Sequence, residues 1–169
     1  MTEQLVGLVS HFPKELGTVL IAMLPIAELR GAIPWALASA PLGGGLGWQE
    51  AYLYAVIGNF LPVIPMLLLL EPLSSRLRRF RFFDRLFTWL FARTRMRGKL
   101  IERYEALGLI LFVGIPLPVT GAWTGTVAAF LFGIPPKRAL PAILAGILLA
   151  GVVVTLASLG VIGFLKIFL

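Results

Sequence analysis

A carboxylate and a guanidinium stand two residues apart inside an apolar run, in the stretch Pro25-Ile-Ala-Glu28-Leu-Arg30-Gly31-Ala-Ile-Pro34. Such groups can bind a proton, a cation or an anionic phosphate. An ionisable residue at the centre of a membrane helix costs about 3 kcal/mol on insertion scales, so its presence in an apolar segment points to a functional site. Glu28 and Arg30 are therefore the first candidate binding residues.

Helix breakers flank this pair. On a continuous α-helix, side chains two positions apart point to different faces and pair poorly. Pro25 and Pro34 bracket the charges, Gly31 lies beside them, and Pro34 disfavours helical dihedrals at Ile33, which predicts unwound backbone around the pair. Irregular backbone at membrane depth survives only where it lines a cavity or is buried in protein. Gly31 and Pro34 are therefore candidate binding residues too.

A second apolar segment, residues 107–133, also has breakers and polar side chains at its centre. If this segment crossed a membrane once, Lys137 and Arg138 would lie opposite the main basic cluster, against the positive-inside rule. We therefore expect a re-entrant hairpin, with a single crossing as the alternative. Its threonine and backbone groups would supply polar contacts and its tryptophan an apolar wall. The candidate binding residues here are Pro116, Pro118, Thr120, Gly121 and Trp123.

The composition is that of an integral membrane protein. Of 169 residues, 59% are hydrophobic and only 14% are charged, whereas soluble domains carry about 25% charged residues. Residues 51–70 and 139–164 are apolar runs long enough to span a bilayer, and Pro62 and Pro65 should kink the first. Asn59, its one strongly polar side chain, serves either as interhelical hydrogen-bond glue or as a substrate contact.

Catalytic and cofactor chemistry find no support in the sequence. The chain has no cysteine and one histidine, which excludes disulfides, Cys-based metal sites and histidine clusters. No Ser/His or metal-binding constellation is present, so we expect neither an enzyme nor a bound cofactor or metal.

The basic residues are concentrated in one segment. Ten of the fifteen Lys and Arg residues fall within residues 76–103, next to a spanning run, so the net charge of +7 is a topology signal and not a sign of nucleic-acid binding. Arginines and phenylalanines alternate there at helical spacing. This pattern predicts an interfacial helix on anionic lipid, or a loop that obeys the positive-inside rule; both are cytoplasmic. The candidate lipid-interface residues are Arg78, Arg81, Arg85, Phe80, Phe83 and Phe87.

The two halves of the chain follow the same plan. We expect an all-α integral membrane protein, a single membrane domain of two inverted repeats. Each repeat is a re-entrant or broken helical hairpin plus a spanning helix. The first repeat covers residues 1–70, the basic amphipathic linker 71–106 and the second repeat 107–169. Paired, interrupted segments of this kind mark a transporter's binding site near the bilayer midplane.

The two breaker-rich motifs resemble the signatures of the small multi-drug export protein family of prokaryotic membrane proteins. They read Glu28-Leu-Arg30-Gly31-Ala-Ile-Pro34 and Pro116-Leu-Pro118-Val-Thr120-Gly121-Ala-Trp123-Thr-Gly125. More distantly, the chain is similar to the DedA membrane proteins, some of which move polyprenyl-phosphate lipids and which tend to carry further charges in both hairpins. The resemblance implies transport at the cytoplasmic membrane by a multi-pass protein. The second hairpin here has no ionisable residue, which argues against a mechanism that needs a second carboxylate or arginine.

We therefore expect an ion-coupled transporter or lipid translocase that moves a small amphiphile. A dominant Glu28 favours a drug-like cation, and a dominant Arg30 favours a polyprenyl phosphate. A homodimer is expected to enclose the path. Two alternatives stay open: the charged pair is a structural ion pair, or the chain is a non-transporting scaffold that binds anionic lipid or a partner through the Arg/Phe segment.

Overall fold

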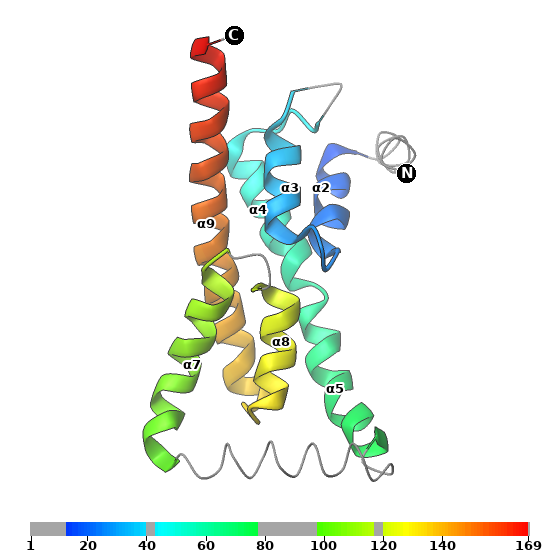
Figure 1. Cartoon of the computed structure of the whole chain (residues 1–169). Coiled ribbons are helices and arrows are strands. Elements are labelled where there is room, and N and C mark those ends of the chain that lie inside the picture. The colour runs from blue at the N-terminus through cyan, green and yellow to red at the C-terminus, as the bar shows by residue number, and fades with distance from the viewer. Residues whose placement is uncertain (1–12, 40–42, 78–97, 117–119, 169) are drawn as a thin grey trace. The chain divides into compact units, whose positions relative to one another are not determined.

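The described part of the chain is helical. The computed structural model describes residues 13–39, 43–77, 98–116 and 120–168, and its regular secondary structure there consists of α-helices (Figure 1). This confirms the all-α prediction. The helices are α2 (Lys14–Met23), α3 (Glu28–Leu37), α4 (Trp48–Phe60), α5 (Val63–Leu77), α7 (Gly98–Gly114), α8 (Ala122–Leu131) and α9 (Pro136–Phe168).

Two helical segments are long and apolar enough to cross a membrane. They are Trp48–Leu70, which comprises α4 and the start of α5, and Pro136–Ile162 within α9. The first is interrupted between Phe60 and Val63, where Pro62 has no N–H to continue the helical bonding. The predicted spanning runs and the predicted proline bend are therefore both present.

The other apolar helices are short and come in pairs. Helices α2 and α3 have ten residues each, as do α8 and the apolar end of α7, Glu105–Gly114. A ten-residue helix is about 15 Å long, half of the roughly 30 Å hydrocarbon core. Helices α2 and α3 form one helical hairpin, and α7 and α8 form another (Figure 1).

The chain divides into two compact units. The first consists of Met1–Leu61 and Leu148–Leu169, and the second of Pro62–Ile147. In the first unit, α4 packs on both helices of the α2–α3 hairpin; in the second, α8 packs on α5 and α7. Each unit therefore contains one hairpin, the first part of one long helix and the second part of the other.

In the first unit, α4 approaches α2 through a glycine. A Cβ added to Gly58 would lie 2.8 Å from the Cα of Val19 and 2.9 Å from the Cβ of Ala22. Any larger residue would push the helices apart, so Gly58 permits the close contact that small residues provide between membrane helices.

The second unit contains the same kind of contact. A Cβ added to Gly146 of α9 would lie 2.9 Å from the carbonyl oxygen of Ile110 and 2.6 Å from the Cβ of Val113, both in α7. Gly58 is the eleventh residue from the start of α4 at Trp48, and Gly146 is the eleventh from the start of α9 at Pro136. The residues that they meet also match: in each hairpin they lie four residues and one residue before the end of the first helix.

The predicted unwinding at Ile33 is wrong. Helix α3 continues through Pro34, and Ile33 is helical and completely buried. Burial of one face of α3, including Leu29, Ala32 and Ala36, compensates for a proline in the helix, which costs about 3 kcal/mol. The break in this hairpin instead precedes Glu28.

Candidate functional site

Glu28 stands at the turn between the two helices of the first hairpin. Helix α2 ends at Met23 and α3 begins at Glu28 itself. The N–H of Glu28 donates to the carbonyl of Leu24 at 2.9 Å, and the N–H of Gly31 donates to that of Ala27 at 2.8 Å. These bonds close the turn and fix the backbone from which the Glu28 side chain projects.

The Glu28 backbone is strained. Its φ angle is +44°, and no other non-glycine residue in the described ranges has a positive φ. The left-handed region costs a non-glycine residue about 1–2 kcal/mol. Strain of this kind is concentrated at functional sites and persists only where the surrounding structure enforces it.

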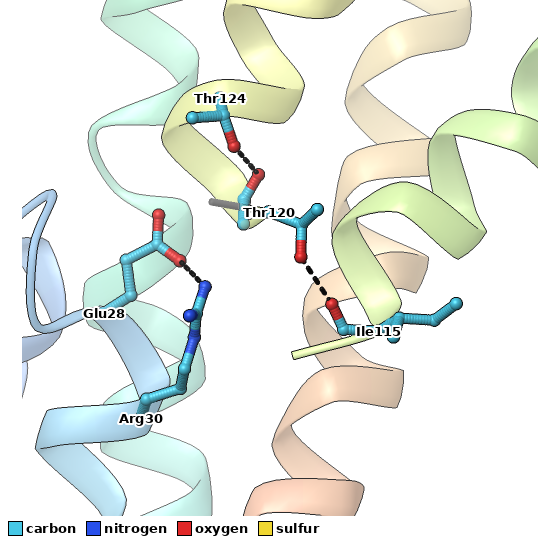
Figure 2. Close-up of polar contacts among 6 residues, drawn as sticks. Glu28, Arg30, Ile115, Thr120 and Thr124 are labelled. Carbon is cyan, nitrogen blue, oxygen red and sulfur yellow. Dashed lines mark hydrogen bonds and ion pairs between the residues drawn. The ribbon is translucent and has the colours of Figure 1, made fainter. Parts of the chain in front are cut away.

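Glu28 and Arg30 approach each other across this turn. Arg30 Nη2 lies 4.0 Å from Glu28 Oε2 (Figure 2), at the outer limit for an ion pair. The side chain of Glu28 is 8% exposed and that of Arg30 is 32% exposed. The left-handed backbone at Glu28 allows this approach between residues two positions apart, which a continuous helix would disfavour.

Gly31 and Pro34 have different surroundings. A Cβ added to Gly31 would lie 2.9 Å from the Cβ of Ala27 and 3.8 Å from Ile21 of α2, so Gly31 allows the hairpin to close beside the charged pair. Pro34 is exposed in α3. Within this hairpin, the structure brings Glu28, Arg30 and Gly31 into one helical turn, and Pro34 lies farther along α3.

In the second hairpin, hydroxyl groups bond to the backbone. Thr120 Oγ1 donates to the carbonyl of Ile115 at 2.6 Å and ties together the two sides of the break (Figure 2). Thr124 Oγ1 donates to the carbonyl of Gly121 at 3.3 Å. These contacts give both hydroxyls a structural role in shaping the start of α8.

The remaining predicted site residues fall into two groups. Pro116 lies in the break and Trp123 in the first turn of α8, and both are half-buried. Pro118 lies outside the described residues. So do the predicted lipid-interface residues Arg78, Arg81, Arg85, Phe80, Phe83 and Phe87.

Among the described residues of the first unit, two buried polar side-chain atoms have no hydrogen-bond partner. They are Asn59 Oδ1 in α4 and Thr155 Oγ1 in α9; the residues are 1% and 5% exposed. A buried polar atom without a partner costs about 1–3 kcal/mol. The sequence marks Asn59 as the polar residue of an apolar run. It gives no such signal for Thr155, which reads only as one more small residue of α9.

The arrangement at the turn of the first hairpin is suited to binding. Within the described ranges, no group of three or more His, Asp or Glu side chains is placed to hold a metal ion. The buried Glu28 carboxylate can exchange a proton or bind a cationic group, and the Arg30 guanidinium beside it can bind an anionic group.

The described residues are helical and include two helices long and apolar enough to span a membrane, together with two short hairpins. The sequence model of the small multi-drug export protein family matches residues 28–153, from the start of α3 into α9. The chain belongs to this family, whose description indicates a transporter rather than an enzyme. No curated protein and no solved structure matches the chain.

Proposed function

We propose that this protein is an ion-coupled transporter of the prokaryotic cytoplasmic membrane that moves a small amphiphile, with Glu28 and Arg30 as its binding groups. The observation that carries the proposal is the strained, buried carboxylate at the turn of the first hairpin, 4.0 Å from a guanidinium. Membership of an export family supports transport as the process.

In this proposal both hairpins are re-entrant. Their apolar helices have ten residues each, and helices of about 15 Å that turn back cannot cross the bilayer. The turn of each hairpin would then lie near the midplane. Broken helices at that depth are where transporters bind substrates and coupling ions.

The same proposal makes the two halves inverted repeats. The matching positions of Gly58 and Gly146, each packed against the first helix of a hairpin, support a common origin. The fourth residue of α3 is Gly31 and the fourth of α8 is Gly125, and each glycine is close to the first helix of its own hairpin. The inversion itself rests on the positive-inside argument for the basic segment between the halves.

Ion coupling follows from the cost of a buried charge. A carboxylate that changes its surroundings during transport is stabilised by taking up a proton or a cationic cargo. Arg30 provides the contrasting chemistry, because its planar fork suits phosphate oxygens. The two cargo classes are a drug-like cation and a polyprenyl phosphate, and a second copy of the chain would complete the path.

The test compares transport by variants in proteoliposomes. We expect Glu28→Gln and Arg30→Ala each to lower ethidium transport under an imposed pH gradient at least tenfold while thermal unfolding is little changed. Glu50→Gln, at the exposed start of α4, is the matched control and should transport normally. A parallel assay with a fluorescent short-chain polyprenyl phosphate separates the cargo classes. Full activity of both site variants with both probes would exclude the proposal and favour the scaffold.

A further inference from the structure

Asn59 has the properties of a further binding residue, in addition to Glu28 and Arg30. It is 1% exposed, and its Oδ1 atom has no hydrogen-bond partner. Buried amide oxygens are normally satisfied, so an exception needs a reason such as a ligand or an ordered water.

The position of Asn59 relates it to the first hairpin. It follows Gly58, which packs closely against Val19 and Ala22 of α2. Ala22 is the penultimate residue of α2, directly before the turn that leads to Glu28. Helix α4 also packs on α3. Asn59 therefore lies in the same unit as Glu28 and at the level of the hairpin turn.

The fold does not need a polar residue at this position. In the second unit, the residue that follows the corresponding glycine, Gly146, is Ile147, which is completely buried. An aliphatic side chain is therefore sufficient to pack this place in the architecture.

The amide oxygen of Asn59 also cannot find a hydrogen-bond partner in the way that buried threonine hydroxyls do. Thr18 and Thr126 are buried and donate to carbonyls of their own helices. Asn59 Oδ1 only accepts hydrogen bonds, and no N–H group of α4 donates to it. Its donor must come from outside α4.

We propose that Asn59 is a specificity residue of the transport site and accepts a hydrogen bond from an N–H group of a cationic cargo. The inference rests on the proposed function and narrows its substrate class to amphiphilic ammonium compounds that retain N–H donors. Glu28 supplies the charge that attracts the cation, and Asn59 supplies the neutral acceptor. A quaternary ammonium satisfies Glu28 only, and a phosphate has no N–H donor for Asn59 and is repelled by the Glu28 carboxylate.

The experiment uses two probes with the same hexyl chain and the same charge: hexylammonium, which has N–H donors, and hexyltrimethylammonium, which has none. Their binding to the full-length protein in nanodiscs is measured by calorimetry against empty nanodiscs. The wild type should bind hexylammonium at least tenfold more tightly. Asn59→Ile, which introduces the residue type of Ile147, should lose this preference by weakening hexylammonium alone. Glu28→Gln should weaken both probes.

Two further variants separate binding from folding. Asn59→Asp keeps an acceptor oxygen and should keep the preference. Thr155→Val removes the other unpartnered polar atom of this unit and should also keep it. Thermal unfolding of Asn59→Ile should occur at or above the wild-type temperature, since an unpartnered polar group is removed.

The outcomes distinguish the two proposals. If Asn59→Ile keeps the preference while Glu28→Gln weakens both probes, the role of Asn59 is wrong and the transport site stands. If Asn59→Ile unfolds at a lower temperature and Asn59→Asp also loses the preference, the amide is structural. If the wild type binds neither probe above empty nanodiscs, the inference and the cationic form of the proposed function both fail.

Discussion

At the scale of single residues, the most informative feature is the backbone of Glu28. A left-handed φ of +44° at a non-glycine residue indicates that the turn holds the carboxylate where it is despite the conformational cost. Glycine would adopt this backbone without strain, but would carry no charge. The residue type at this position therefore costs stability, which the proposed binding role would explain.

This strain predicts an unusual ranking of two variants. Both Glu28→Gly and Glu28→Ala remove the carboxylate, so their difference reports the backbone alone. We expect the glycine variant to be more stable by about 1 kcal/mol, because alanine disfavours the left-handed region. The measurement is equilibrium unfolding in mixed micelles.

The control pair is Val152→Gly and Val152→Ala, at an exposed position within α9. There the order should reverse, with alanine more stable by about 1 kcal/mol, as in an ordinary helix interior. If alanine were also the more stable residue at position 28, the strained backbone would not be a property of the protein.

At the scale of elements, two glycines determine how the long helices meet the hairpins. Gly58 brings α4 against α2, and Gly146 brings α9 against α7. Neither contact leaves room for a Cβ without movement of the backbone or of a neighbouring side chain.

Alanine at either position should therefore destabilise the protein. We expect Gly58→Ala and Gly146→Ala each to cost about 1–3 kcal/mol, since overpacking forces helices apart. Gly108→Ala in α7 is the control, because nothing lies within 4 Å of its added Cβ; it should be neutral or stabilising by up to about 1 kcal/mol. Unfolding in mixed micelles checks all three, and equal effects would contradict the packing argument.

Elements also show what could be predicted from the sequence. The breaks near Pro62 and after Gly114 follow from prolines, which have no N–H to continue the helical hydrogen bonds. Pro34 misleads because burial of one face of α3 outweighs its local preference, a tertiary effect that sequence reading does not capture. Asn59 is visible as a polar residue in an apolar run, but only the structure reveals that its oxygen has no partner.

At the scale of the whole molecule, the long helices connect the two units. Each unit combines one hairpin with parts of both long helices, and Tyr52 of α4 donates to the carbonyl of Leu148 in α9 at 3.1 Å. Residues 96 positions apart in the chain thus complete the first unit. Periodicity and composition predict the helices. They do not predict that each unit contains parts of both long helices, because this depends on long-range packing.

The central claim is that the two halves are inverted and that their hairpins turn inside the membrane. Because the chain has no native cysteine, single-cysteine variants at Ser39, Arg97 and Lys137 can be labelled in intact cells with a membrane-impermeant maleimide. The account predicts that position 39 is labelled and that positions 97 and 137 are both protected. Labelling of position 137 from outside, with position 97 protected, would mean that residues 107–133 cross once, and would contradict the inverted-repeat account.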